Sequence, residues 1–99
     1  MHVMVKLDES EINERLSRLD GWKLDGDSII KDFEFKDFAQ ALDFMNKVGL
    51  VADKELNHHP DLCNSYNRVS ISLTTHSLEG LSELDFKLAE AADAIASGL

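Results

Sequence analysis

The chain has 99 residues, 43% of them hydrophobic, and a formal net charge of −9 at pH 7. This length and composition fit one globular domain over residues 1–99 and leave no room for a second. The acidic balance argues against nucleic acid and against an anionic membrane surface as partners, because both attract clusters of Lys and Arg.

The first quarter of the chain predicts a short arm and a helix. Residues 1–6 form the arm, in which Val3 and Val5 share one strand face. Asp8 with Glu11 three residues on is typical of a helix start capped by side chains, and Gly21 is expected to end this helix. Its buried stripe is predicted from apolar residues at helical spacing, namely Ile12, Leu16 and Leu19.

A β-hairpin is predicted next. Residues 22–24 and 28–35 are the strands, and Asp25-Gly26 between them is a strong turn signal. Alternation along the second strand separates an apolar face from an acidic one, with Ile29, Phe33 and Phe35 against Asp32 and Glu34.

The longest predicted helix follows the cap Asp37, with Gln40 at the reciprocal capping position. Pro60 disfavours helical geometry at His59, so this helix is expected to end near His58. It carries more apolar surface than one small sheet covers, which predicts a homo-oligomer interface. The apolar stripe comprises Phe38, Leu42, Met45, Val48 or Gly49, Ala52 and Leu56.

The last third predicts a second hairpin and a helix. Residues 62–66 and 69–76 are strands around a turn at Asn67-Arg68, a register that places Tyr66 on the apolar face opposite Val69. Residues 69, 71, 73 and 75 share that face, while Ser70, Ser72, Thr74 and His76 share the other. Ser82 caps the last helix with Asp85. The stripe of that helix contains Leu84, Leu88, Ala91, Ala92 and Ile95.

The element order is helix, strand, strand, helix, strand, strand, helix. Two hairpins can join into one four-stranded antiparallel sheet, and three helices can cover its apolar face as a second layer. The sequence therefore predicts a two-layer α+β fold.

Three of the four histidines, His58, His59 and His76, are the strongest candidates for chemistry. Histidine has the unperturbed pKa nearest neutral pH, so it can donate or accept a proton there. His58 and His59 are adjacent, so their side chains diverge by about 100° in a helix or to opposite faces of a strand. Because such neighbours suit a shared metal ion poorly, no metal site is predicted, although Cys63 is near.

Simpler interpretations stay open for each candidate. His58 can be a helix C-cap that interacts with the helix dipole, and His76 can be a solvated side chain on a polar face. A capping box alone accounts for Asp85. Trp22 is typical of a core, although its place beside a turn can put it at the edge of a pocket. Lys54 can be a solvated charge.

The spacing of these residues resembles a family signature. Lys54-x3-His58-His59-Pro60, then Tyr66, His76 and Asp85, is similar to the pattern of the pterin-4a-carbinolamine dehydratases. The likeness runs from residue 7 to residue 95 and includes Gly21-Trp22, Phe33-x-Phe35, Thr74-Thr75-His76 and Gly80-Leu81-Ser82. Lys54 stands where family members often have an acid, so an acidic partner of His58 is expected from Glu55 or Asp53, or is absent.

The resemblance implies an enzyme of tetrahydrobiopterin recycling, a 4a-hydroxytetrahydrobiopterin dehydratase. This hydro-lyase removes water from a 4a-hydroxytetrahydropterin to give the quinonoid dihydropterin, without metal or cofactor. The catalytic set is His58, His59 and His76, with His58 and His76 as acid and base across the pterin. His59 and Pro60 orient the ring. Thr75, Ser77 and Leu78 form the wall beside His76, and the supporting residues are Trp22, Glu55 and Asp85.

The partners and the alternatives follow from the same resemblance. Family members form homo-oligomers, so a homodimer or homotetramer is expected. A non-enzymatic adaptor or transcriptional cofactor with a vestigial pterin pocket is the main alternative, and a zinc-dependent hydrolase is the third. A lone thiol at Cys63, no leader-like start and no apolar run of membrane-spanning length predict a cytoplasmic protein.

Overall fold

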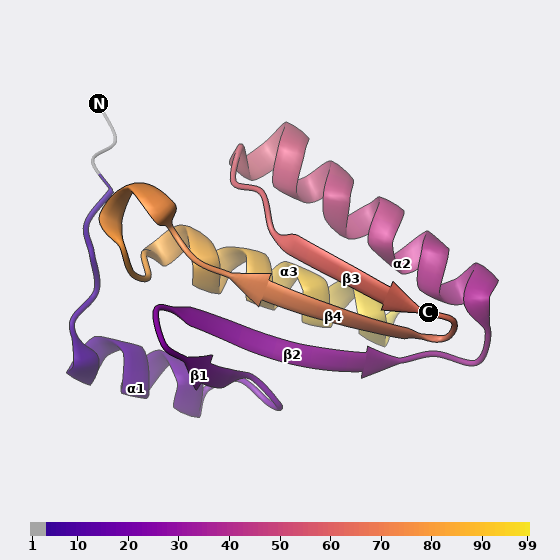
Figure 1. The fold of residues 1–99 in the computed structure, drawn as a ribbon, viewed down its shortest axis with the longest axis horizontal. Coiled ribbons are helices and arrows are strands. Elements are labelled where there is room, and N and C mark those ends of the chain that lie inside the picture. The colour runs from indigo at the N-terminus through magenta and orange to yellow at the C-terminus, as the bar shows by residue number, and fades with distance from the viewer. Residues whose placement is uncertain (1–3) are drawn as a thin grey trace.

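The computed structural model describes residues 4–99, and its elements follow the predicted order (Figure 1). The expected α+β class is confirmed, with one antiparallel sheet in the order β1-β2-β4-β3. The elements are α1 (Glu9–Ser17), β1 (Lys23–Asp25), β2 (Ser28–Glu34), α2 (Phe38–Leu50), a π-helical turn η1 (Val51–Leu56), β3 (Asp61–Ser65), β4 (Arg68–Leu73), a 3-10 turn η2 (His76–Leu78) and α3 (Glu83–Ser97).

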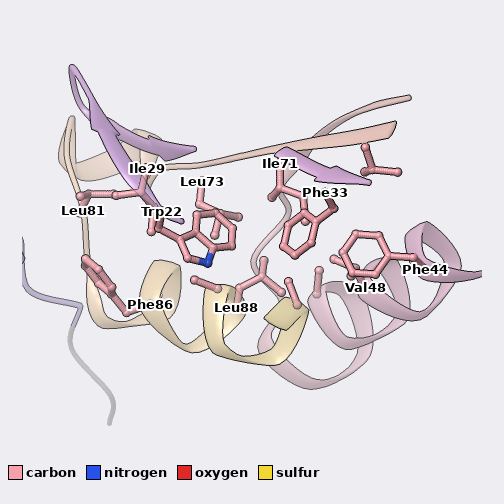
Figure 2. Packing of buried hydrophobic residues seen from close by; sticks show 14 of the residues in the cluster. Trp22, Ile29, Phe33, Phe44, Val48, Ile71, Leu73, Leu81, Phe86 and Leu88 are labelled. Atoms are coloured by element: carbon pink, nitrogen blue, oxygen red, sulfur yellow. The ribbon is translucent and has the colours of Figure 1, made fainter. Parts of the chain in front are cut away.

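The two hairpins join through β2 and β4, which pair from Ile29↔Leu73 to Glu34↔Arg68. The predicted alternation holds for Ile29 and Phe33 of β2 and for Val69, Ile71 and Leu73 of β4, which point to one face and are buried there. Helices α2 and α3 lie against that face, and the core fills the space between the layers (Figure 2). Phe44 of α2 packs against Phe33 of β2 with ring centroids 4.8 Å apart.

The N-terminal arm and α1 close one edge of this core. The arm has no strand in residues 4–8, although Leu7 is buried and its N–H donates to the Leu81 carbonyl at 2.8 Å. Val3, predicted to share a strand face with Val5, lies outside the described residues. The predicted stripe of α1 packs only half-buried against the core. Helix α1 ends at Ser17, and Gly21, with φ of 83°, turns the chain toward β1.

Capping signals located all three helix starts. Asp8 accepts a hydrogen bond from the Glu11 N–H at 2.8 Å, and Asp37 accepts one from the Gln40 N–H at 2.8 Å. The first turn of α3 is a full capping box. One detail differs, because the Gln40 side chain accepts from the Lys36 N–H at 3.0 Å rather than from that of the cap residue.

Both hairpin turns lie one residue away from the predicted positions. The first turn is Gly26-Asp27, because Asp25 pairs with Ser28. Gly26 has φ of 60°, which places glycine's conformational freedom at the first turn position. The shift leaves the faces of β2 as predicted, since its register with β4 is unaffected.

In the second hairpin the same shift changes a side chain's environment. Ser65 pairs with Arg68, so the turn is Tyr66-Asn67, and Asn64 rather than Tyr66 lies opposite Val69. Tyr66 therefore has φ of 50° and is 65% exposed instead of lying on the apolar face. The prediction for Tyr66 was wrong because the turn lies one residue earlier than expected, which takes Tyr66 out of the strand and into a turn position with positive φ.

The predicted stripe of α2 and η1 is confirmed at Val48 and Ala52, which are fully buried, and is wrong toward the start of the helix. Ala41, Phe44 and Val48 face the core, whereas Phe38 and Leu42 are 45% and 44% exposed. Both stripes have helical spacing, so periodicity alone could not choose between them. The core of α3 is rotated from the predicted one, because Phe86 and Ala89 join Leu88 and Ala92 in it, while Leu84, Ala91 and Ile95 are half-buried.

Candidate functional site

The three histidines lie at one end of the β3–β4 pair, where His58 and His59 precede β3 and His76 follows β4. Asp61 pairs with Ser72, so the residues before β3 and those after β4 come together there. Thr75 then bridges to Gly80 and closes a short loop around η2. Because α3 starts just after that loop, its first turn lies at the same end of the sheet (Figure 1).

A π-helical turn and a left-handed residue carry the chain from α2 to His58. The Ala52 carbonyl in η1 accepts hydrogen bonds from the backbone N–H groups of Asn57 and His58, the latter at 2.9 Å. Asn57 has φ of 47° and is the C-cap, so His58 is not the cap that its position suggested. π-Helical turns often mark functional sites, and this one precedes the most enclosed histidine of the candidate set.

His58 belongs to a buried hydrogen-bond network with α3. Its Nε2 lies 2.5 Å from Oδ1 of Asp85, and its side chain is only 11% exposed. Asp85 is fully buried, and its Oδ2 accepts from Thr75 Oγ1 at 2.8 Å and from the Ser82 N–H at 2.9 Å. Thr75 Oγ1 also lies 2.8 Å from Ser82 Oγ. Both carboxylate oxygens are therefore partnered, and the carboxylate has one fixed position.

This arrangement determines which ring nitrogen of His58 remains free to exchange a proton. An ionised carboxylate can only accept hydrogen bonds, so Nε2 must carry the hydrogen that faces Asp85. The second ring nitrogen, Nδ1, is left to accept or donate a proton elsewhere. A carboxylate that fixes the tautomer of a histidine in this way is a recurring device of acid–base sites.

Two expectations about the acidic residues are wrong. The acidic partner of His58 is Asp85, not Asp53 or Glu55. Capping alone also fails to account for Asp85, because one of its oxygens binds the α3 N-terminus and the other binds His58. Glu55 is exposed, and within residues 4–99 no hydrogen bond or ion pair joins it to a histidine.

His59 points away from this network, as the divergence of adjacent side chains predicts. Its Nε2 lies 2.9 Å from Oδ1 of Asp53, and the two side chains are 63% and 55% exposed. Pro60 is half-buried. The exposed Lys54 lies 3.9 Å from Asp53, which fits a solvated charge.

His76 is exposed and lines a cavity of about 300 Å³ together with Asp27, Ser28, Thr74 and Glu79. The first hairpin turn reaches this cavity because Thr74 Oγ1 donates to the Asp27 carbonyl at 2.6 Å. We name these residues the His76 cavity. Its walls were missed by sequence reasoning, because only the β2–β4 register brings the turn of the first hairpin beside the end of β4.

The wall predicted from the family resemblance is different. Thr75 is buried and directed to Asp85 and Ser82, so its neighbour Thr74 faces the cavity instead. Ser77 is exposed and Leu78 is half-buried, and neither belongs to the His76 cavity.

Trp22 is a core residue, and its contacts lie away from the histidines. Its Nε1 donates to both carboxylate oxygens of Asp93, at 3.2 and 3.1 Å, and its ring packs edge-on against Phe33 (Figure 2). Lys31 Nζ adds an ion pair to Asp93 at 2.8 Å. These contacts fasten β2 and the loop before β1 to α3.

The described residues form neither a metal-binding cluster nor a membrane-spanning helix. In the described part of the chain, residues 4–99, no group of three or more His, Cys, Asp or Glu side chains is arranged to hold a metal ion. No helix in this same range combines the length and apolar character that crossing a bilayer requires.

Comparisons with known proteins agree with the residue pattern. The family model described as Pterin 4 alpha carbinolamine dehydratase matches residues 5–95. A protein of Sinorhizobium fredii named for pterin-4-alpha-carbinolamine dehydratase activity is 52% identical over 95 residues, covering 94% of this chain and 90% of its own. A protein of Sulfurisphaera tokodaii with the same name is 49% identical over 90 residues, covering 91% of this chain and 96% of its own.

Comparisons with solved structures agree with these sequence comparisons. The crystal structure of a transcriptional coactivator/pterin dehydratase from Brucella melitensis has a TM-score of 0.88 and 50% identity, covering 93% of this chain and 99% of that one. A pterin dehydratase-like RuBisCO assembly factor of the alpha-carboxysome has a TM-score of 0.62 and 24% identity, covering 76% of this chain and 86% of that one. At that identity the second structure supports the fold alone.

Proposed function

The chain belongs to the pterin-4a-carbinolamine dehydratase family, and we propose that it removes water from 4a-hydroxytetrahydropterins to give quinonoid dihydropterins. The observation that carries this proposal is the buried contact between His58 and Asp85 at the end of the sheet that also holds His59 and His76. This contact equips the site for acid–base chemistry, and the names of the relatives indicate a pterin substrate.

The reaction needs two proton transfers. The substrate carries a hydroxyl on C4a and a hydrogen on N5. An acid protonates the hydroxyl so that it leaves as water, a base removes the N5 proton, and the C4a–N5 bond becomes double. We assign one transfer to Nδ1 of His58 and the other to His76, because histidine exchanges protons near neutral pH.

The other residues have supporting tasks in this proposal. Asp85 is a positioning residue that fixes the tautomer and orientation of His58. His59 and Pro60, which immediately follow, hold the pterin ring. Carbinolamines already lose water slowly in solution, so modest acid–base assistance suffices, and the mechanism uses no metal. The physiological role assigned to this activity is tetrahydrobiopterin recycling.

A stopped-flow assay on a chemically generated 4a-hydroxytetrahydropterin tests this function. We expect the purified protein to accelerate formation of the quinonoid dihydropterin, with the same rate before and after exhaustive chelation. Activity that chelation abolishes and zinc restores would contradict the histidine mechanism and favour a zinc enzyme. An absence of acceleration would favour the non-enzymatic adaptor.

We also propose that the protein is a symmetric homo-oligomer. Phe38 and Leu42 are nearly half exposed on α2, beside the half-buried Met45, and Leu50 is 59% exposed near the end of the helix. Apolar side chains clustered on a surface usually mark an interface. We expect light scattering at micromolar concentration to give a multiple of the chain mass, and Leu42→Glu to lower it. A monomeric mass for the unaltered protein would overturn this proposal.

We place the enzyme in a reducing compartment such as the cytoplasm. Cys63 is an exposed free thiol on β3, and such thiols persist where glutathione keeps them reduced.

A further inference from the structure

The His76 cavity is lined by two acidic residues that the proposed chemistry does not use. Asp27 lies in the first hairpin turn and Glu79 directly follows η2, and both line the same cavity of about 300 Å³ as His76. That volume is at the small end of ligand pockets and suits a two-ring heterocycle. Any ligand that His76 reaches from this cavity is therefore also within the surroundings of two acidic side chains.

Both carboxylates are carried on backbone that is fixed at the cavity. The Asp27 carbonyl accepts from Thr74 Oγ1 at 2.6 Å, and its turn is closed by the pairing of Asp25 with Ser28. The Glu79 N–H donates to the His76 carbonyl at 3.1 Å, so Glu79 and His76 are tied together. Two short, hydrogen-bonded segments thus meet at one cavity.

Neither carboxylate has another task in the described residues. Asp53, Asp85 and Asp93 are all engaged by a histidine, a lysine or a tryptophan. By contrast, within residues 4–99 no side-chain hydrogen bond or ion pair involves the carboxylate of Asp27 or Glu79. Both carboxylates can therefore accept hydrogen bonds from a ligand that presents several donors along one edge.

The substrate proposed above has such an edge. The 2-amino-4-oxopyrimidine ring of a pterin presents the N3–H and the 2-amino hydrogens side by side, a pair that matches the two oxygens of one carboxylate. We propose that Asp27 and Glu79 determine the specificity for pterins by binding this edge. Asp27 accepts hydrogen bonds from the N3–H and one 2-amino hydrogen, and Glu79 accepts one from the other 2-amino hydrogen. This inference rests on the proposed function.

Two variants and a matched control test this inference by ligand binding, without relying on turnover. Asp27→Asn and Glu79→Gln remove one charge each without changing side-chain size. Asp25→Asn removes a charge two positions before Asp27, from a residue that does not line the cavity. The probe is 6-methyl-7,8-dihydropterin, a stable ligand whose dissociation constant is measured by fluorescence titration. Melting curves confirm that each variant is folded.

We expect Asp27→Asn to weaken binding about 10-fold and Glu79→Gln about 3- to 10-fold, because hydrogen bonds to charged acceptors contribute more than neutral ones. Asp25→Asn should change the dissociation constant less than about 2-fold. The rise in KM should exceed any fall in kcat, since a contact to an unreacting edge is shared by ground and transition states.

A second ligand makes the test specific for the edge. The 2-dimethylamino counterpart of the probe lacks the amino hydrogens and keeps only the N3–H, so it should bind weakly to the unaltered protein, and Asp27→Asn should weaken its binding less than that of the probe. An equal further loss in that variant would overturn the inference, because the carboxylate would then act on something other than the amino edge.

The outcomes separate this inference from the proposed function. Dehydration with unchanged probe binding in both variants would overturn the role of Asp27 and Glu79 and leave the enzyme assignment standing. Probe binding that depends on Asp27, in a protein without dehydration activity, would support the edge contact and overturn the proposed catalysis. No probe binding by the unaltered protein would overturn the inference outright.

Discussion

His58 and His59 are neighbours in sequence and each lies beside an aspartate, yet the two pairs have opposite surroundings. His58 and Asp85 are 11% and 0% exposed and share a network with Thr75 and Ser82. His59 and Asp53 are both more than half exposed, and their one further partner within the described residues is the exposed Lys54, 3.9 Å from Asp53. The first pair connects the segment before β3 to α3, whereas the second connects two residues that are six positions apart.

A short histidine–carboxylate distance therefore does not by itself identify a catalytic site. An exposed pair is screened by water and contributes about 0–1 kcal/mol to stability, with little control over ring orientation. A buried pair whose carboxylate is fully hydrogen-bonded has one geometry and one tautomer. We therefore expect changes at the buried pair to affect catalysis and folding, and the same changes at the exposed pair to affect neither strongly.

The largest expected effect separates Asp85→Asn from Asp53→Asn. An amide at position 85 can present its NH2 group to Nε2 of His58 and so favour the wrong tautomer, which should lower kcat about 10²-fold. Asp53→Asn should leave kcat within about 3-fold. Stopped-flow kinetics measure both, and imidazole ¹⁵N shifts report the tautomer independently of activity. Unaltered turnover in Asp85→Asn would reduce this residue to a helix cap, whose loss costs only about 0.5–2 kcal/mol of stability.

The next effect separates the histidines themselves. His58→Ala and His76→Ala should each lower kcat about 10- to 100-fold, at or below the low end for acid–base groups, because the uncatalysed reaction is already appreciable. His59→Ala should instead raise KM more than it lowers kcat. Steady-state kinetics with melting curves give both parameters. If His59→Ala alone abolished turnover, the assignment of acid and base would be wrong.

A smaller effect concerns stability alone. Thr75→Val removes one of the donors to the buried Asp85 carboxylate, and we expect a loss of about 1–3 kcal/mol in the free energy of unfolding. Thr74→Val, one residue earlier, removes a more exposed bond to the Asp27 carbonyl and should cost less than about 1 kcal/mol. Urea denaturation compares the two. Equal losses would mean that the buried network adds nothing beyond a surface contact.

The smallest effect is expected at the exposed pair. Asp53→Asn should change the free energy of unfolding by less than about 0.5 kcal/mol, since exposed ion pairs contribute little. The same urea titration measures it. A loss as large as that of Thr75→Val would show that exposure fails to distinguish the two pairs.

Local signals in the sequence were enough for the order of elements and the helix starts. Asp8, Asp37 and Ser82 cap the helices that they were predicted to begin, because capping depends on residues three apart. The choice between two apolar stripes of α2 depends on what packs against them. The position of the turn at Tyr66 depends on how β3 pairs with β4. Neither the buried stripe nor the turn position can be predicted from the sequence of one segment alone.

The same limit applies to the site. The histidines were identified from their spacing, but Asp85 was already explained by a local cap and its second partner is 27 positions away. Asp27 and Thr74 are 47 positions apart and meet only through the strand order of the sheet. Contacts of this kind follow from topology, which a reading along the chain does not provide.

The π-helical turn Val51–Leu56 makes the site depend on chain length as well as on residue type. Such a turn holds one residue more than an α-helical path would, as an inserted codon produces. Deleting one codon within it would let the helix close regularly and rotate the following residues by about 100°. His59 would then occupy the position from which His58 contacts Asp85. A gene that varies in length by a single codon here would therefore exchange the buried histidine for the exposed one without any substitution.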